Sequence, residues 1–200
     1  MAANDIYGLV VCGGKSTRMG REKYLLDYHG LPQYQHVHQL LEPFCSKVFI
    51  SCNPIQAPHI DPAFPALTDH ISYRESGPVA GLLSAFNTYP DKHWLVTGCD
   101  YPLITATEIE ALTGCFTQGL NTTAFYNRTT GYYEPLLAVY ASGCYSRLEA
   151  HFRQQQYSLQ QFLKEEKAVR CYPQEDDRLK SIDTPEAYEQ TRRLIRNGYS

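Results

Sequence analysis

The chain has 200 residues, of which 43% are hydrophobic and 20% charged, and its formal net charge is −3 at pH 7. This length suits one α/β domain with a sizeable core, and the slightly acidic balance argues against a basic surface for nucleic acid. No apolar run approaches the ~20 residues of a membrane span, so we expect no membrane partner. The seven cysteines form no C-x-x-C pair, and their odd number, without a signal-peptide pattern, indicates reduced thiols in the cytoplasm.

The first predicted element is a buried strand over residues 6–11, which leads into Cys12-Gly13-Gly14-Lys15-Ser16-Thr17-Arg18-Met19-Gly20. Glycines let a backbone approach an anion closely, and successive N–H groups in such a turn can surround it. Three basic side chains, Lys15, Arg18 and Lys23, would add positive charge. We therefore predict a phosphate-binding loop rather than a glycine-rich turn with incidental surface cations.

Two common phosphate-loop patterns do not fit this stretch. A Walker A loop requires G-x-x-x-x-G-K-[ST], and Gly14-Lys15-Ser16 supplies its end, but Leu9 stands where the leading glycine is needed. The dinucleotide pattern G-x-G-x-x-G also fails, because no glycine lies two residues after Gly14. The sequence therefore predicts a third kind of phosphate loop.

A β-α-β unit follows the loop. Apolar residues between positions 37 and 44 recur at i, i+3, i+4 and i+7, which predicts one buried face of a helix that ends near Pro43. Residues 47–52 predict a second strand, parallel to the first and reached by a right-handed crossover. After a proline-rich loop over residues 54–65, Ala66–Asp69 predicts a minimal strand.

The next predicted helix begins at Pro78, after Ser76-Gly77, and buries residues 79, 82, 83 and 86. Gly81 lies inside this helix, although glycine costs about 1 kcal/mol there relative to alanine. Two explanations stay open. Either a ribose or a base approaches this turn, or the helix packs very closely against the sheet.

Residues 93–98 predict a central strand that ends in Cys99-Asp100-Tyr101-Pro102. An acid at the carboxyl end of a parallel strand lies where open α/β sheets bind ligands, and Mg²⁺ usually takes one or two protein carboxylates. Asp100 is therefore a candidate magnesium ligand. The alternative is a cap for the helix that begins near Thr105, which Pro102 disfavours because it separates the acid from that helix.

The alternation of strands and helices breaks in the second half. Thr105-x-x-Glu108 is a capping box for a helix to Phe116, and two strands, 122–126 and 136–140, form a hairpin that could bind a second substrate. The remaining predicted elements are helices at 142–152 and 158–165, a strand at 168–172 and a last helix from 183–186 onward.

These elements predict a single Rossmann-like three-layer α/β/α domain over residues 1–200. Its sheet is mostly parallel, with a β-hairpin excursion in the C-terminal half. We expect residues 1–105 to bind the nucleotide and residues 106–200 to bind the acceptor.

The loop, together with Lys23-Tyr24-Leu25-Leu26, resembles the signature of nucleotidyltransferases, and most closely that of the MobA-like molybdenum cofactor guanylyltransferases. That family's pattern is (L)-A-G-G-x-S-x-R-M-G-x-x-K-x-L-L, and Cys12 replaces its small residue before the glycines. The resemblance continues in the same order through Ile50-Ser51-Cys52-Asn53, Thr68-Asp69, Gly77-Pro78-Val79-Ala80-Gly81-Leu82, Cys99-Asp100-Tyr101-Pro102 and Ser181-Ile182-Asp183-Thr184-Pro185-Glu186.

The resemblance implies roles for individual residues. Arg18, Lys23 and Asp100 would be catalytic, and Asp100 would bind Mg²⁺, with Asp183 as a second candidate ligand. The implied nucleotide-binding residues are Cys12, Gly13, Gly14, Lys15, Ser16, Lys23, Asn53, Asp69, Gly77, Gly81 and Asp100. Two departures concern the acceptor side. Ser181 and Asp183 replace both asparagines of the family's N-x-N-T-P-E motif, and Glu134-Pro135 stands where relatives often carry Gln-Pro or His-Pro before a strand.

The implied reaction transfers GMP from GTP to the terminal phosphate of molybdopterin, the organic part of the molybdenum cofactor, with release of pyrophosphate. A molybdoenzyme maturation protein would be a further partner. A carboxylate such as Asp69 could accept the N1–H and N2–H₂ donors of guanine, whereas cytosine offers only its amino group, so the sequence favours GTP. The alternatives are a related enzyme that uses CTP or a sugar or alditol phosphate acceptor, and a nucleotide-binding accessory protein without catalysis.

Overall fold

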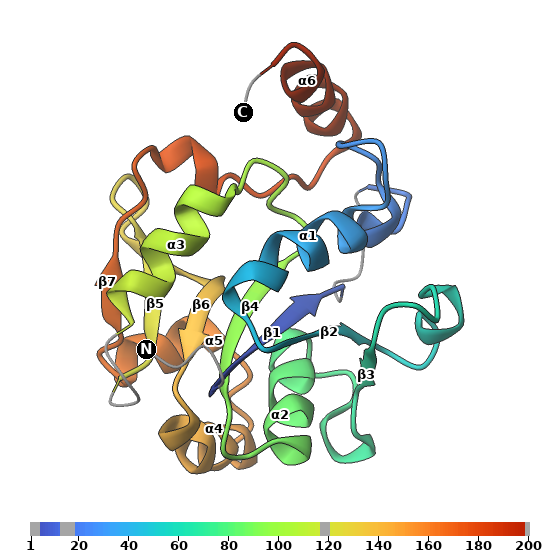
Figure 1. Cartoon of the computed structure of the whole chain (residues 1–200). Coiled ribbons are helices and arrows are strands. Elements are labelled where there is room, and N and C mark those ends of the chain that lie inside the picture. The colour runs from blue at the N-terminus through green and yellow to red at the C-terminus, as the bar shows by residue number, and fades with distance from the viewer. Residues whose placement is uncertain (1–4, 13–18, 117–120, 199–200) are drawn as a thin grey trace.

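A single mixed sheet organises the chain, and the computed structural model describes residues 5–12, 19–116 and 121–198. Seven described strands follow the order β3-β2-β1-β4-β6-β5-β7, and only β6 runs antiparallel to its neighbours (Figure 1). The strands are β1 (Ile6–Val11), β2 (Lys47–Cys52), β3 (Ala66–Thr68), β4 (His93–Gly98), β5 (Thr123–Asn127), β6 (Tyr132–Tyr140) and β7 (Val169–Cys171). This arrangement confirms the predicted α/β fold with a hairpin in its second half.

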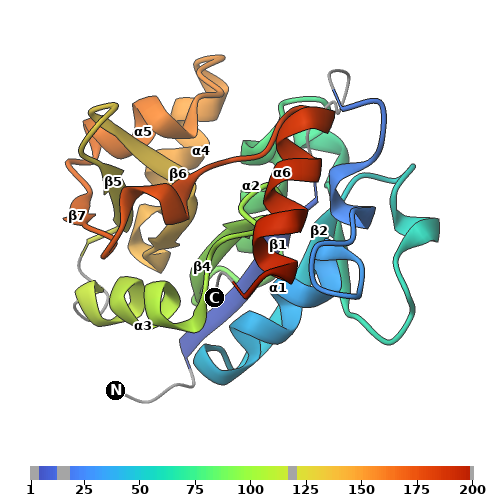
Figure 2. The same ribbon diagram turned by 90° about the horizontal axis from the view of Figure 1, so that it is seen from above.

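Helices cover both faces of the sheet and give three layers. Figure 2 shows α1 and α3 on one face and α2, α4 and α5 on the other. The helices are α1 (Gln33–Leu41), α2 (Pro78–Thr88), α3 (Ala106–Cys115), α4 (Tyr145–Arg153), α5 (Leu159–Glu165) and α6 (Pro185–Arg196). None of the described helices is long and apolar enough to cross a membrane.

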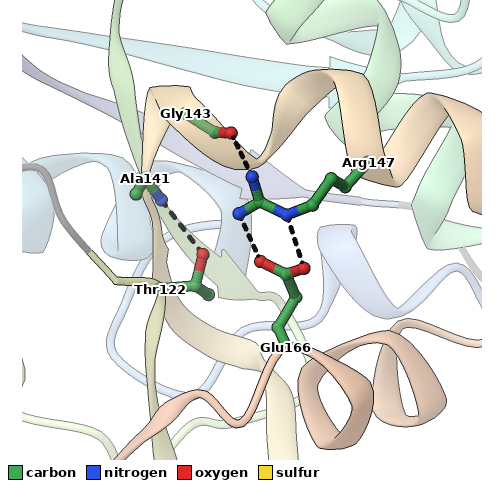
Figure 3. A network of polar contacts seen from close by, with 5 residues as sticks. All are labelled: Thr122, Ala141, Gly143, Arg147 and Glu166. Carbon is green, nitrogen blue, oxygen red and sulfur yellow. Dashed lines mark hydrogen bonds and ion pairs between the residues drawn. The ribbon is translucent and has the colours of Figure 1, made fainter.

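Two apolar cores lie against the two faces of the sheet because the strands are buried on both sides. Leu9 and Trp94 pack toward α2, α4 and α5, whereas Val10 and Leu95 pack toward α1 and α3. All four side chains have no measurable exposure. On the first face, Arg147 of α4 also forms a two-pronged ion pair with Glu166 at the end of α5, at 2.6 and 2.7 Å (Figure 3). This contact ties the two helices of the C-terminal half together.

The strand β6 begins four residues earlier than the sequence analysis predicted, at Tyr132 instead of residue 136. Glu134-Pro135 therefore lies inside a strand, not before it. The register between β5 and β6 shifts between Ala124 and Tyr126, which leaves a bulge in β6 around Pro135. A proline lacks the N–H for a regular ladder but is tolerated at a bulge, so it did not end the strand here.

The last helix, α6, belongs to neither of the two helical layers and lies at the edge of the sheet where the parallel strands end (Figure 1). It is held there by a small cluster that we call the α6 cluster: Met19, Leu26, Tyr28, Ile182 and Tyr188. The cluster joins the residues that follow the predicted phosphate loop to the residues around the start of α6. The segment around the start of α6 therefore lies at the edge of the sheet where β1 and β4 end.

Candidate functional site

Three charged side chains from distant parts of the chain meet at the carboxyl edge of the sheet. Lys23, in the short 3-10 turn η2 (Lys23–Leu25), forms an ion pair with Asp183, and its Nζ lies 3.9 Å from Oδ2 of Asp100. Their side chains are 21%, 43% and 23% exposed, so each can reach a ligand. The structure thus brings together one cation and two acids that the sequence analysis proposed from three separate motifs.

Asp100 is positioned by its own strand and by the segment before α6. The N–H of Ile182 donates to the carbonyl oxygen of Asp100 at 2.8 Å. A Cβ at Gly98 would lie 2.5 Å from Oδ1 of Asp100 and 3.2 Å from Cδ1 of Leu136. The carboxylate therefore packs directly against Gly98, and a side chain at that position would displace it.

The helix α3 has its own N-terminal cap and leaves Asp100 available. Oε2 of Glu108 accepts hydrogen bonds from the N–H of Thr105 at 3.1 Å and from its hydroxyl at 2.6 Å. This is the predicted capping box. The cap that we considered as an alternative role for Asp100 is thus filled by other residues.

Two acidic side chains of this cluster, Asp100 and Asp183, are the candidate ligands for a divalent cation. Burial raises the pKa of Asp100, Lys23 lowers it, and Asp183 raises it again. Two carboxylates share one lysine, and carboxylate oxygens are the ligands that Mg²⁺ prefers. No group of three or more His, Cys, Asp or Glu gathers in a metal-binding arrangement within the ranges given above. Asp100 and Asp183 could hold Mg²⁺ only together with oxygens of a substrate or of water.

A cleft of about 790 Å³ opens beside this cluster. It lies between the carboxyl ends of β1 and β2, the residues after β3, and the start of α2. Of the predicted nucleotide-binding residues that the structure describes, four line it: Asn53, Asp69, Gly77 and Gly81. Glu22, directly before Lys23, also lines the cleft, so the cleft reaches the neighbourhood of the charged cluster.

Two polar side chains in the cleft have defined hydrogen-bonding capacity. Burial raises the pKa of Asp69 to about 6, and the nearby Arg74 opposes this rise. Above that pH the carboxylate is an acceptor. Oδ1 of Asn53 accepts the N–H groups of Ile55 and Gln56, both at 2.9 Å, so the amide group of Asn53 has its NH₂ donors left for a ligand.

Gly81 allows α2 to pack closely on the sheet. A Cβ at this position would lie 2.1 Å from Oγ of Ser51 in β2 and 3.7 Å from Oδ1 of Asp69. Close helix–sheet packing, one of the two explanations that the sequence left open, therefore accounts for this glycine. Gly81 also lines the cleft, so approach of a ribose or base at the same turn stays a prediction.

The predicted phosphate loop is only partly described. Gly13, Gly14, Lys15, Ser16 and Arg18 lie outside the described residues. The side chain of Cys12 is buried, with its Sγ 3.8 Å from Sγ of Cys99 in the neighbouring strand end. Burial raises the pKa of its thiol well above the usual range. The thiol thus points into the core, and contact with a nucleotide would have to come from the backbone of Cys12.

Gln56 is buried and lines the cleft, although nothing in the sequence had marked it as a site residue. Its Oε1 accepts the N–H of Asn53 at 3.1 Å, and its Nε2 donates to the carbonyl oxygen of Cys12 at 3.4 Å. This side chain connects the start of the phosphate loop to the turn that carries Asn53. The sequence did contain a sign of this turn, because the pair Asn53-Pro54 favours a turn. Residues that follow such a turn, here Gln56, can lie close to the asparagine.

Glu134 lies next to the charged cluster on the hairpin side. The hydroxyl of Tyr101 donates to its Oε2 at 3.0 Å, and burial and the nearby Asp100 both raise the pKa of Glu134. From the sequence, Glu134 was notable only as a departure from the family pattern. The structure places it within the same polar region as Asp100, on the side where we expected the acceptor.

Comparisons with known proteins agree with this arrangement. The MobA-like NTP transferase domain model matches residues 8–170. A molybdenum cofactor guanylyltransferase of Pseudomonas putida is 31% identical over 185 residues, which cover 89% of this chain and 93% of the relative. A molybdenum cofactor biosynthesis bifunctional protein of Synechocystis is 36% identical over 141 residues, or 70% of this chain, but this chain spans only 40% of that longer protein.

A solved structure shows the same fold. The molybdopterin-guanine dinucleotide biosynthesis protein A of Archaeoglobus fulgidus superposes with a TM-score of 0.74 over 96% of this chain and 99% of that chain. Its sequence identity is 19%, so the similarity supports the fold and not a substrate. The matched family region ends at residue 170, before the segment that carries Asp183.

Proposed function

This chain belongs to the MobA-like NTP transferase domain family, and we propose that it transfers GMP from GTP to the terminal phosphate of molybdopterin. The observation that carries the proposal is the position of Lys23 and Asp100 at the carboxyl edge, beside a cleft lined by Asn53 and Asp69. The Pseudomonas putida relative is named a molybdenum cofactor guanylyltransferase, which supports a guanylyl transfer to this cofactor. The products would be a guanine dinucleotide cofactor and pyrophosphate.

The reaction moves one phosphoryl centre between two oxygens. An oxygen of the molybdopterin phosphate forms a bond to the α-phosphorus of GTP, and the bond from that phosphorus to the oxygen bridging to the β-phosphorus breaks. Pyrophosphate leaves with the electron pair of the broken bond. A phosphate nucleophile is already ionised at neutral pH, so no general base is required, and positioning with charge stabilisation supplies most of the catalysis.

Lys23 would stabilise the negative charge that develops on the α-phosphoryl group. Its Nζ lies beside carboxylate oxygens of Asp100 and Asp183, at the edge of the sheet where the phosphates would bind. Asp100 and Asp183 would hold Mg²⁺ together with substrate oxygens. The ion would supply charge neutralisation on the phosphates. Asp100 depends on Gly98 and on the backbone bond from Ile182 for its position.

The cleft would hold the guanosine part of GTP. Asp69 could accept the N1–H and N2–H₂ donors of guanine, and the NH₂ group of Asn53 could donate to its carbonyl oxygen. Residues 1–105 would thus bind the nucleotide. The hairpin side of residues 106–200, where Glu134 and Tyr101 interact, would face the acceptor.

The test is a survey of substrates. The purified protein is incubated with Mg²⁺ and each of GTP, CTP, ATP and UTP, with and without molybdopterin, and pyrophosphate release is measured. We expect release only with GTP and molybdopterin together. Release with CTP would replace the nucleotide in the proposal, and nucleotide binding without any release would favour the accessory-protein alternative.

A further inference from the structure

The ion pair between Lys23 and Asp183 joins the end of the phosphate loop to a segment beyond the matched family region, which ends at residue 170. The family motif that this segment resembles has asparagine where this chain has Asp183. An asparagine could form a hydrogen bond to Lys23 but would carry no charge. The charged pair is therefore a property of this chain that the family resemblance does not supply.

The backbone that presents Asp183 is fixed on both sides. Before it, the N–H of Ile182 donates to the carbonyl oxygen of Asp100. After it, Thr184 caps α6, and the hydroxyl of Tyr188 donates to the carbonyl oxygen of Asp27 at 3.1 Å. Ile182 and Tyr188 are also buried in the α6 cluster. The carboxylate of Asp183 thus has a defined place beside Lys23.

We propose that Asp183 is a positioning residue that holds Lys23 as its counter-ion in the ligand-free chain and gives it up to the phosphates of a nucleoside triphosphate. Lys23 is one cation between two carboxylates, and Asp183 is the more exposed of the two, at 43% against 23% for Asp100. A triphosphate in the cleft would pass Glu22 and bring several negative charges to the same ammonium group. Binding then exchanges one anion for another on Lys23.

This role has a measurable consequence for affinity. Without the charge at position 183, Lys23 is available before the ligand arrives. In buffer without Mg²⁺, the variant Asp183→Asn should bind a nucleoside triphosphate about tenfold more tightly than the unchanged chain, which corresponds to ~1.4 kcal/mol.

Two other roles for Asp183 predict different results. If Asp183 acted only as a metal ligand, its replacement would leave affinity in Mg²⁺-free buffer unchanged. If its charge only repelled the triphosphate, the replacement would tighten binding whether or not Lys23 was present. The variant Lys23→Met distinguishes simple repulsion from the proposed role, because it keeps most of the side-chain length and removes the charge.

The experiment is a double-mutant cycle. Affinity for each of the four nucleoside triphosphates is measured by calorimetry without Mg²⁺ in the unchanged chain, Asp183→Asn, Lys23→Met and the double variant. We expect the tenfold gain from Asp183→Asn to fall to about twofold or less in the Lys23→Met background. The matched control is Asp5→Asn, which removes an acid paired with Lys92 at the amino edge of the sheet, and it should change no affinity. An equal gain in both backgrounds, or no gain at all, would overturn the inference.

The inference rests on the proposed function only in that its ligand is a nucleoside triphosphate. If GTP does not bind, the coupling between Lys23 and Asp183 is calculated from the affinities for whichever of the four triphosphates does bind. A second measurement needs no nucleotide: competitive acetylation of lysines in the ligand-free protein, followed by mass spectrometry of the peptide that contains Lys23. Its labelling rate should rise several-fold in Asp183→Asn and stay unchanged in Asp5→Asn. An unchanged rate in Asp183→Asn would contradict the pair even if the proposed reaction were correct.

Discussion

Replacing Gly98 with alanine should disable the site while leaving the fold in place. The new methyl carbon would lie 2.5 Å from Oδ1 of Asp100 and 3.2 Å from Cδ1 of Leu136. The contact with Leu136 can relax by a few tenths of an ångström, but the carboxylate of Asp100 must move. Overpacking of this kind costs about 1–3 kcal/mol of folding free energy. A displacement of about 1 Å at a reacting group can cost about 100-fold in turnover.

The assay compares turnover per folded molecule with urea unfolding of the same samples. The matched control is Gly8→Ala, because its methyl carbon would lie 3.1 Å from both γ-carbons of Val48, in the amino-terminal half of β1 and away from the site. Both variants should lose stability, but only Gly98→Ala should lose about 100-fold in turnover. Turnover within threefold of the unchanged chain in Gly98→Ala would refute the placement of Asp100 at the reacting centre.

Three further outcomes follow from the same site. The variant Asp100→Ala should abolish transfer and keep the urea midpoint close to that of the unchanged chain, whereas near-normal turnover would remove Asp100 from the site. Lys23→Ala should lower turnover by about 100-fold or more, as expected for a charge that acts on the transferred group, and an unchanged rate would exclude Lys23 from the reaction. Burial in the folded chain raises the pKa of Asp69 from its ordinary value of 3.8 to about 6, so the folded state binds this proton more tightly than the unfolded state does. The stabilisation from this group is therefore complete below about pH 4 and is lost as the pH rises through 6. Affinity for GTP should rise over the same interval as the carboxylate ionises, and Asp69→Asn should flatten both profiles; an unchanged pH profile in Asp69→Asn would exclude this carboxylate from guanine binding.

Much of the fold could be predicted because its parallel strands are continuous apolar runs with clear ends. The bounds of β1, β2 and β4 agree with the sequence analysis, and the capping box of α3 is present as predicted. Asp100 could be proposed as a ligand because it follows a central strand directly. These features depend on local sequence alone.

The remaining features depend on contacts between distant segments. The early start of β6 required a bulge at Pro135, which only pairing with β5 defines. The pair of Lys23 with Asp183 exists because Tyr188 and Ile182 dock the C-terminal segment against residues 19–28. Gln56 is a site residue because the turn at Asn53 folds its side chain under Cys12. The Asn53-Pro54 pair indicates a turn, but it does not show which side chain the turn carries to Cys12, and no periodicity or motif indicates the other two contacts.

The most direct test of the central claim is identification of the product. The protein is incubated with Mg²⁺, molybdopterin and GTP labelled at the α-phosphate. The products are then separated and identified by mass spectrometry. The account predicts a labelled guanine dinucleotide of molybdopterin in equal amount to pyrophosphate, and neither product with Asp100→Ala. Transfer of the label to another acceptor would contradict it, and so would a preference for the cytosine dinucleotide when an equal amount of CTP is added to the same mixture.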